Sequence, residues 1–122
     1  MRIQEVILEN VLAVAREDFT DTIIALGLAQ KWLGMLDARA RIQDYKYYLA
    51  LYPYHGSDSK LQYSISLEVG SAGSSTPILH QPVGSIAHNG TVGIVHRAGG
   101  LLLNPVQRKG LATAAKTVLS GV

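Results

Sequence analysis

The sequence contains no cysteine and has few charged residues. Without cysteine it cannot form a disulfide framework, a thiolate metal site or a cysteine nucleophile. Charged residues make up 16% of the 122 residues and hydrophobic residues 48%, whereas about a quarter of an average soluble domain is charged. A small chain with this balance has surplus apolar surface, so we expect it to associate with copies of itself.

Acidic residues are missing from the second half of the chain. Every Asp and Glu lies at or before Glu68, and residues 69–96 contain no charged side chain, although the net charge is only +2. A stretch this neutral predicts a buried strand, a subunit contact or a loop packed against a neighbour. For residues 70–76, which are rich in Gly and Ser, a plain surface loop is an equally good interpretation.

Targeting signals and membrane spans are also missing. Arg2 is followed by Gln4 and Glu5, and no apolar region leads to a small-residue cleavage site, so we expect no signal peptide. The apolar runs are far shorter than a membrane span, and we expect no membrane partner. The length suits a single domain over residues 1–122, and the lack of cysteine is typical of a protein used in a reducing cytosol.

Motifs that carry catalysis or hold a cofactor are absent. There is no P-loop, nucleophile elbow or dinucleotide fingerprint. The acidic pairs Glu17/Asp18 and Asp18/Asp21 lie in turn-like sequence, where capping is a commoner role than acid–base catalysis. The spacing of the histidines leaves no local zinc pair; they are His55, His80, His88 and His96. We therefore predict no enzyme, no cofactor and no metal site.

The clearest structural signal is a central hairpin. Residues 61–69 alternate between apolar and polar side chains, residues 41–51 are rich in Tyr and Leu, and turn-forming residues lie between them at 53–59. One face of the predicted hairpin is apolar and carries Tyr45, Tyr47, Leu49, Leu51, Tyr63, Ile65, Leu67 and Val69. The other face is polar or small and carries Lys46, Tyr48, Ala50, Tyr52, Gln62, Ser64, Ser66 and Glu68.

A helix is predicted at the end of the chain. Asn104 is a good N-cap, Pro105 suits the first helical position, and Gly121 is a plausible stop. Apolar residues follow at helical spacing, namely Leu111, Ala114, Ala115, Val118 and Leu119. Gly110 weakens this helix or permits a bend. Before it, residues 91–94 predict a strand, and residues 88–91 predict a two-residue hairpin turn.

The N-terminal third is ambiguous. Residues 3–15 fit either an amphipathic helix or two short strands, although their β-branched residues favour strands. Residues 23–33 leave the same two alternatives open.

The polar face of the hairpin suggests a binding surface. Lys and hydroxyl groups can reach phosphates, and Tyr can stack on unpaired bases. Such groups are present at Lys46, Tyr48, Tyr52, Ser64 and Ser66. An ordinary solvated sheet face is the simpler interpretation of the same pattern.

The order of these segments resembles the coat proteins of small single-stranded RNA bacteriophages. Residues 29–33 (AQKWL) are similar to that family's Trp-containing strand, and residues 44–48 (DYKYY) to the next strand. The match is best at residues 62–69 (QYSISLEV). Residues 70–81 then resemble a loop that lines the shell's symmetry axes. The last strand and the helix of the family correspond to residues 91–98 and 107–119.

This resemblance implies an α+β fold with an N-terminal hairpin, an antiparallel sheet of about five strands, and a C-terminal helix packed across a dimer partner. It favours strands in the N-terminal third. It implies a homodimer that assembles into an icosahedral shell in the host bacterial cytoplasm, packages single-stranded RNA and represses translation through an RNA hairpin. The implied RNA-binding residues are Ala29, Lys31, Lys46, Tyr48, Tyr52, Ser64, Ser66, Asn89 and Thr91. The implied dimer interface contains Leu67, Leu111, Ala115, Val118 and Leu119.

In an alternative function the protein associates with itself but does not bind RNA. An accessory part of a tailed phage, such as a tail terminator or a head-decoration protein, would also be small, free of cysteine and oligomeric.

Overall fold

The computed structural model describes residues 14–36, 39, 41–71 and 79–121. In chain order the elements are β1 (Ala15–Asp18), α2 (Thr20–Ala25), α3 (Leu28–Leu36), the 3₁₀ turn η1 (Ile42–Asp44), β2 (Tyr45–His55), β3 (Leu61–Ser71), β4 (Leu79–Ile86), β5 (Val92–Ile94), β6 (Arg97–Ala98), β7 (Leu101–Leu102) and α4 (Pro105–Ser120).

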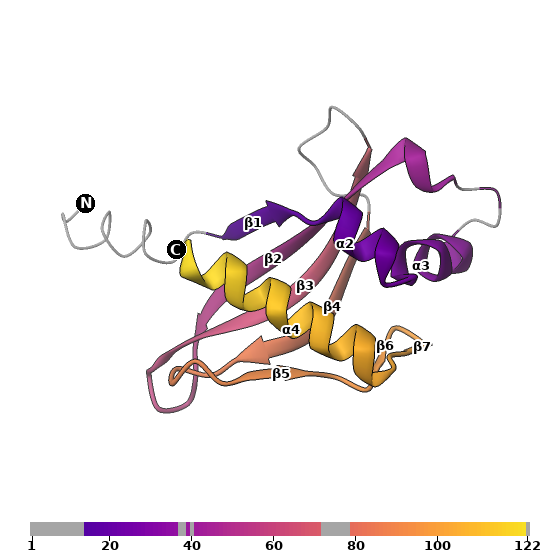
Figure 1. The fold of residues 1–122 in the computed structure, drawn as a ribbon. Helices are drawn as coiled ribbons and strands as arrows, with labels where there is room; N and C mark the ends of the chain where they lie inside the picture. Colours follow the sequence, from indigo (N-terminus) through magenta and orange to yellow (C-terminus); the bar gives the residue numbers. More distant parts are fainter. Residues whose placement is uncertain (1–13, 37–38, 40, 72–78, 122) are drawn as a thin grey trace.

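Five antiparallel strands form one sheet in the order β1-β2-β3-β4-β5 (Figure 1). The predicted hairpin is its centre, where β2 and β3 pair with Leu49 opposite Leu67. Strands β6 and β7 form a separate two-stranded ribbon just before α4. The predicted α+β fold, with about five antiparallel strands and a C-terminal helix, is confirmed.

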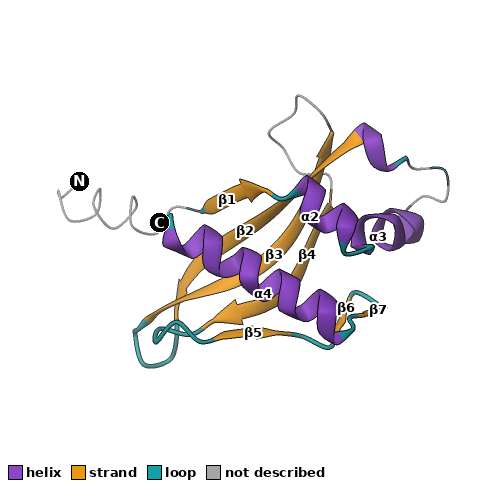
Figure 2. Ribbon diagram, in the orientation of Figure 1, coloured by secondary structure: helices purple, strands orange, loops and turns teal. Residues whose placement is uncertain are grey.

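The helices cover one face of the sheet (Figure 2). Alternate residues of β2 and β3 point into the layer between sheet and helices, as the sequence pattern predicted. Their buried members are Tyr47, Leu49, Leu51, Tyr63, Ile65, Leu67 and Val69. Burial of these apolar side chains is the main stabilising contribution to the fold.

Both hairpin turns have the same geometry. In the β2–β3 turn, the N–H of Ser59 donates to the carbonyl of Gly56, and the N–H of Gly56 donates to the carbonyl of Lys60. The β4–β5 turn repeats this pattern with Gly90 in the place of Ser59. Both residues adopt the left-handed backbone conformation, with φ of 64° at Ser59 and 89° at Gly90. This is a type I turn followed by a bulge, so the turn predicted as two residues around Asn89 contains three.

The prediction of strands in the N-terminal third is wrong for residues 20–36. They form α2 and α3, separated by Gly27 with φ of 74°. The segment that resembles a Trp-containing strand lies within α3. The buried side chains of α3 are spaced so that they lie on one face of the helix. They are Leu28, Ala29, Trp32 and Leu33. Residues 3–13 of the predicted N-terminal hairpin lie outside the described residues, and Ala15 begins β1.

The C-terminal helix begins and ends as predicted. Asn104 accepts from the backbone N–H of Gln107, and the Gln107 side chain accepts from the N–H of Asn104, which makes a full capping box. Gly121 is the C-cap. A Cβ at Gly110 would lie 2.9 Å from the methyl groups of Leu26. The glycine therefore lets α4 approach the α2–α3 turn closely.

The expected packing of the C-terminal helix across a dimer partner stays a prediction. Helix α4 lies across the sheet of its own chain (Figure 1). Leu67, Leu111, Ala115 and Val118 are buried there, and Leu119 is half-buried against the same core. Within one chain these residues belong to the hydrophobic core or pack against it.

Two further segments differ from expectation. The predicted loop at 70–81 is shorter, because β3 extends to Ser71 and β4 begins at Leu79. Residues 72–78 lie outside the described residues. The predicted strand at 91–98 is divided into β5 and β6. Gly99 and Gly100, both with positive φ, then turn the chain from β6 into β7.

Candidate nucleic-acid interface on the open sheet face

The face of the sheet opposite the helices is uncovered in the described part of the chain (Figure 2). The strand register defines which side chains it carries. We call this surface the open face; its members are Arg16, Asp18, Lys46, Tyr48, Ala50, Tyr52, Tyr54, Gln62, Ser64, Ser66, Glu68, His80, Pro82 and Ser85.

A buried carboxylate lies in the middle of the open face. Glu68 is 0% exposed although none of the described helices covers it. Its Oε1 accepts a hydrogen bond from Arg16 Nε at 2.6 Å. Its Oε2 accepts from the hydroxyl of Tyr52 and lies 3.0 Å from His80 Nδ1. Strands β1, β2 and β4 therefore each place one partner on the Glu68 side chain of β3. These bonds offset the cost of burying a charge.

The charges in this cluster follow from its contacts. Burial alone would raise the pKa of Glu68, but hydrogen bonds from Arg16, Tyr52 and His80 outweigh it and hold that pKa below its ordinary value of 4.5. The hydrogen bond to Glu68 is the main cause of a raised pKa at Arg16. Burial, followed by the bond to Glu68, raises the pKa of Tyr52. At neutral pH the cluster holds an Arg16–Glu68 ion pair and an uncharged tyrosine.

Ser66, His80 and Glu68 are connected in the order of a catalytic triad. His80 Nδ1 faces Glu68, and His80 Nε2 lies 3.1 Å from Ser66 Oγ. However, Ser66 is 0% exposed, so its hydroxyl cannot reach a substrate. The backbone of β3 pairs with β2 on one side and with β4 on the other, with a register shift between Ile65 and Ser66. The three residues therefore act as a clamp that fixes the His80 ring against β3.

Three tyrosines follow one another along β2 on the open face. Tyr54 is 43% exposed, whereas Tyr48 and Tyr52 are half-buried. The Tyr52 and His80 rings meet edge to face, with centroids 5.2 Å apart. Arg16 Nη2 also donates to the Tyr52 hydroxyl at 3.2 Å. The Tyr52 ring is thus held in one orientation from two sides.

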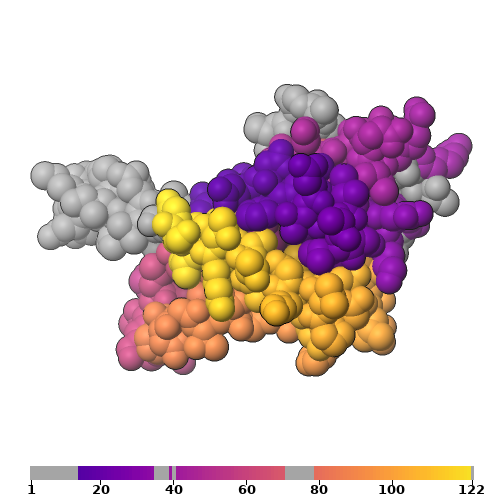
Figure 3. Space-filling view, in the orientation of Figure 1, coloured from indigo at the N-terminus to yellow at the C-terminus, as the bar shows by residue number. Residues whose placement is uncertain are grey.

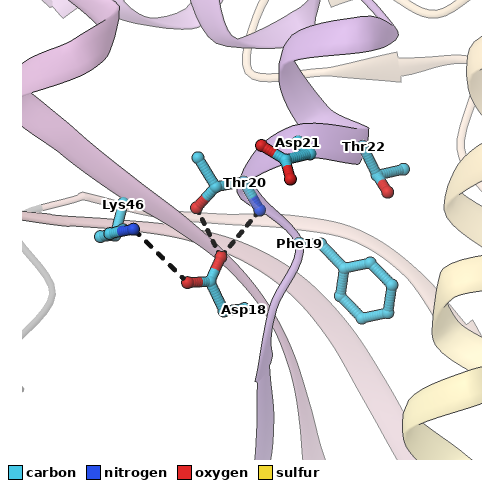
Figure 4. A pocket seen from close by; sticks show the side chains of 6 residues that line it. All are labelled: Asp18, Phe19, Thr20, Asp21, Thr22 and Lys46. Carbon is cyan, nitrogen blue, oxygen red and sulfur yellow. Dashed lines mark hydrogen bonds and ion pairs between the residues drawn. The ribbon is translucent and has the colours of Figure 1, made fainter.

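A hollow of about 520 Å³ adjoins the open face where β1 meets α2 (Figure 4). Lys46 Nζ lies 4.0 Å from Asp18 Oδ2 at its wall. The other Asp18 oxygen accepts from the backbone and the hydroxyl of Thr20. Burial would raise the pKa of Asp18, but its bonds to Thr20 and its proximity to Lys46 lower it. Asp18 is therefore ionised at neutral pH and offsets the charge of Lys46.

Five of the nine predicted RNA-binding residues share the open face, namely Lys46, Tyr48, Tyr52, Ser64 and Ser66. The other four do not. Ala29 is fully buried in the core, and Lys31 is exposed on α3, on the helix side. Asn89 and Thr91 lie together in the β4–β5 turn, where Asn89 Oδ1 accepts from the Thr91 N–H. The prediction is therefore wrong for Ala29 and Lys31 as members of this face, because their segment is a helix.

Sequence reasoning missed Arg16 and His80 as members of the open face. Arg16 lies in the N-terminal third, where no pattern distinguished strand from helix. His80 lies in a segment interpreted as a loop. Only the pairing of β1 with β2 and of β4 with β3 brings both to Glu68.

No group of three or more His, Asp or Glu side chains within residues 14–36, 41–71 and 79–121 is arranged to hold a metal ion. None of the helices in these ranges is long and apolar enough to cross a membrane. Comparison with known proteins found no family model, curated protein or solved structure that matches the chain.

Proposed function

We propose that this protein is a structural protein that associates with copies of itself into a virus shell and binds single-stranded RNA on its open face. The observation that carries the proposal is the division of the sheet into two faces. One face is closed by helices, and the other presents a row of tyrosines flanked by Arg16 and Lys46. This division is the one expected of an RNA phage coat protein.

The spacing of the tyrosines supports an unpaired nucleic acid as the ligand. Tyr52 and Tyr54 are two residues apart, which is about 6.8 Å along a strand. That is twice the rise of about 3.4 Å between neighbouring bases of one strand. Aromatic rings at this interval suit stacking on unpaired bases, whereas a base-paired helix shows its bases only at the groove edges.

The electrostatics of the open face predict modest, salt-sensitive binding. Lys46 and Arg16 are its two fully charged cations, and each faces a carboxylate, Asp18 and Glu68. A phosphate must compete with these carboxylates for the cations. Stacking on tyrosine therefore supplies much of the affinity, and the ionic part falls as salt rises.

A tailed-phage accessory protein without RNA is the second candidate. The pairing of both cations within the chain favours it, because a surface whose charges are already balanced needs no polyanion. The helices at residues 20–36 favour it too, since strands are expected there in the coat protein family.

Expression of the chain alone in bacteria tests the proposal. We expect particles visible by electron microscopy that protect host RNA from added nuclease. Particles or rings free of nucleic acid would support the second candidate. A monomer at high concentration would contradict both functions.

A further inference from the structure

One end of the molecule combines exposed apolar side chains with positive charge. Leu102 is 65% exposed and Val106 71% exposed. Arg97 lies opposite Leu102 in the β6–β7 ribbon, and Lys109 follows Val106 by three residues on α4, which places it on the same side of the helix. We call these four residues the basic end.

The basic end lies at the surface. The β6–β7 ribbon turns at Gly99 and Gly100 next to the start of α4 (Figure 1), and its orange segment is at the surface in Figure 3. Every Asp and Glu of the chain lies at or before Glu68. The segment that forms the basic end therefore has no acidic side chain of its own to balance Arg97 and Lys109.

A surface of opposite character lies at the β1–α2 junction. The hollow there is lined by Asp18, Phe19, Thr20, Asp21, Thr22 and Lys46 (Figure 4). Asp18 and Lys46 offset each other, which leaves Asp21 as the uncompensated charge among the lining residues. The half-buried ring of Phe19 points away from Asp18 and Lys46 and packs against the core. We call this surface the acidic hollow.

We propose that the basic end of one copy docks into the acidic hollow of the next copy. In this contact the cations Arg97 and Lys109 meet the carboxylate of Asp21, and the exposed side chains of Leu102 and Val106 are covered by the neighbouring copy. This inference rests on the proposed self-association and specifies how it occurs. Because the two surfaces differ, the contact is head to tail, and it produces rings, shells or filaments rather than closed two-fold dimers.

Charge reversal on each side tests the contact. One variant carries Arg97→Glu and Lys109→Glu, and the other carries Asp21→Lys. We expect each variant alone to associate at least about tenfold more weakly than the unmodified chain, measured by analytical ultracentrifugation. Lys116→Glu is the control, because Lys116 is exposed on α4 and the substitution is the same as Lys109→Glu on the same helix; it should associate normally.

Mixing the two variants gives the sharper result. The variant with a reversed basic end keeps an intact acidic hollow, and the other variant keeps an intact basic end. The reversed end of the first variant also complements the reversed hollow of the second. An equimolar mixture should therefore regain the association that each variant alone has lost, in assemblies where the two variants alternate. Variants that assemble like the unmodified chain would overturn the head-to-tail contact while leaving the proposed function intact. An unmodified chain that stays monomeric would overturn both.

Discussion

Glu68 shows how one buried charge can organise a surface that no helix covers. Its carboxylate receives Arg16 from β1, Tyr52 from β2 and His80 from β4. These side chains lie over the centre of the sheet, so Ser66 is fully buried without a covering helix. Removing the charge should therefore loosen the arrangement of the whole open face as well as one ion pair.

Replacement of Glu68 by Gln should lower stability in a pH-dependent way. The folded-state pKa of Glu68 lies below its ordinary value of 4.5, so the ionised form stabilises the protein above that value, and this contribution is lost as pH falls through the folded-state pKa. We expect the variant to lose about 1–2 kcal/mol of unfolding free energy near neutral pH, a modest figure because Arg16 is partly exposed.

Urea unfolding across the acidic range measures this effect. The difference between the unmodified chain and Glu68→Gln should shrink as the solution is acidified. A difference that is constant with pH would show that the charge of Glu68 contributes nothing.

The two equivalent turns provide a matched pair of substitutions. Ser59 adopts φ of 64° and Gly90 φ of 89° at the same position of their hairpins. A side chain is disfavoured in this region by about 1 kcal/mol. Ser59→Gly should therefore raise the unfolding free energy by about that amount, and Gly90→Ser should lower it similarly. If urea unfolding showed that both substitutions change the unfolding free energy by equal amounts of the same sign, the two turns would not share this geometry.

At the scale of elements, the central hairpin and the last helix could be predicted because local signals agree with the tertiary structure. The period-2 pattern of β3 matches its buried face, and Asn104 with Pro105 marks the start of α4. Residues 23–33 gave conflicting signals. Trp32 and Leu33 fit a strand or a helix equally well, and the resemblance favoured the strand. Trp32 and Leu33 form part of the helix α3 because one face of that helix packs against the core.

The capping box of α4 should contribute measurably to the free energy of unfolding. Asn104→Ala removes the acceptor for the Gln107 N–H, whereas the backbone N–H of residue 104 that donates to the Gln107 side chain is kept. We expect the unfolding free energy to fall by about 1 kcal/mol in urea unfolding. Thr113→Ala, an exposed change on the same helix, serves as the control and should change it much less.

At the scale of the whole molecule, the candidate site could be predicted only in part. The five correctly placed residues lie on one hairpin, where alternation alone decides which way a side chain points. Arg16 and His80 reach the same face through pairings of β1 and β4 with that hairpin. Such pairings depend on contacts between distant segments, which a local pattern does not record.

If RNA binds the open face and not the helix side, substitution of a lysine on each side should affect RNA binding differently. Lys46→Ala removes a cation from the open face, and Lys116→Ala makes the same change on the outer side of α4. We expect Lys46→Ala to weaken binding of single-stranded RNA and to reduce the slope of log affinity against log salt by about 0.7. Lys116→Ala should leave both unchanged, as measured by fluorescence anisotropy at several salt concentrations. Equal effects of the two substitutions would remove Lys46 from the site.

The six tyrosines give the most direct test of the central claim, that single-stranded RNA lies on the uncovered face of the sheet. Tyr48, Tyr52 and Tyr54 belong to the open face, whereas Tyr45, Tyr47 and Tyr63 point to the helix side. Ultraviolet crosslinking of the intact protein to single-stranded RNA, followed by mass spectrometry, distinguishes these two sets. We predict crosslinks at Tyr48, Tyr52 or Tyr54 and none at the other three. Crosslinks confined to the helix side, or the absence of any crosslinked peptide, would contradict the claim.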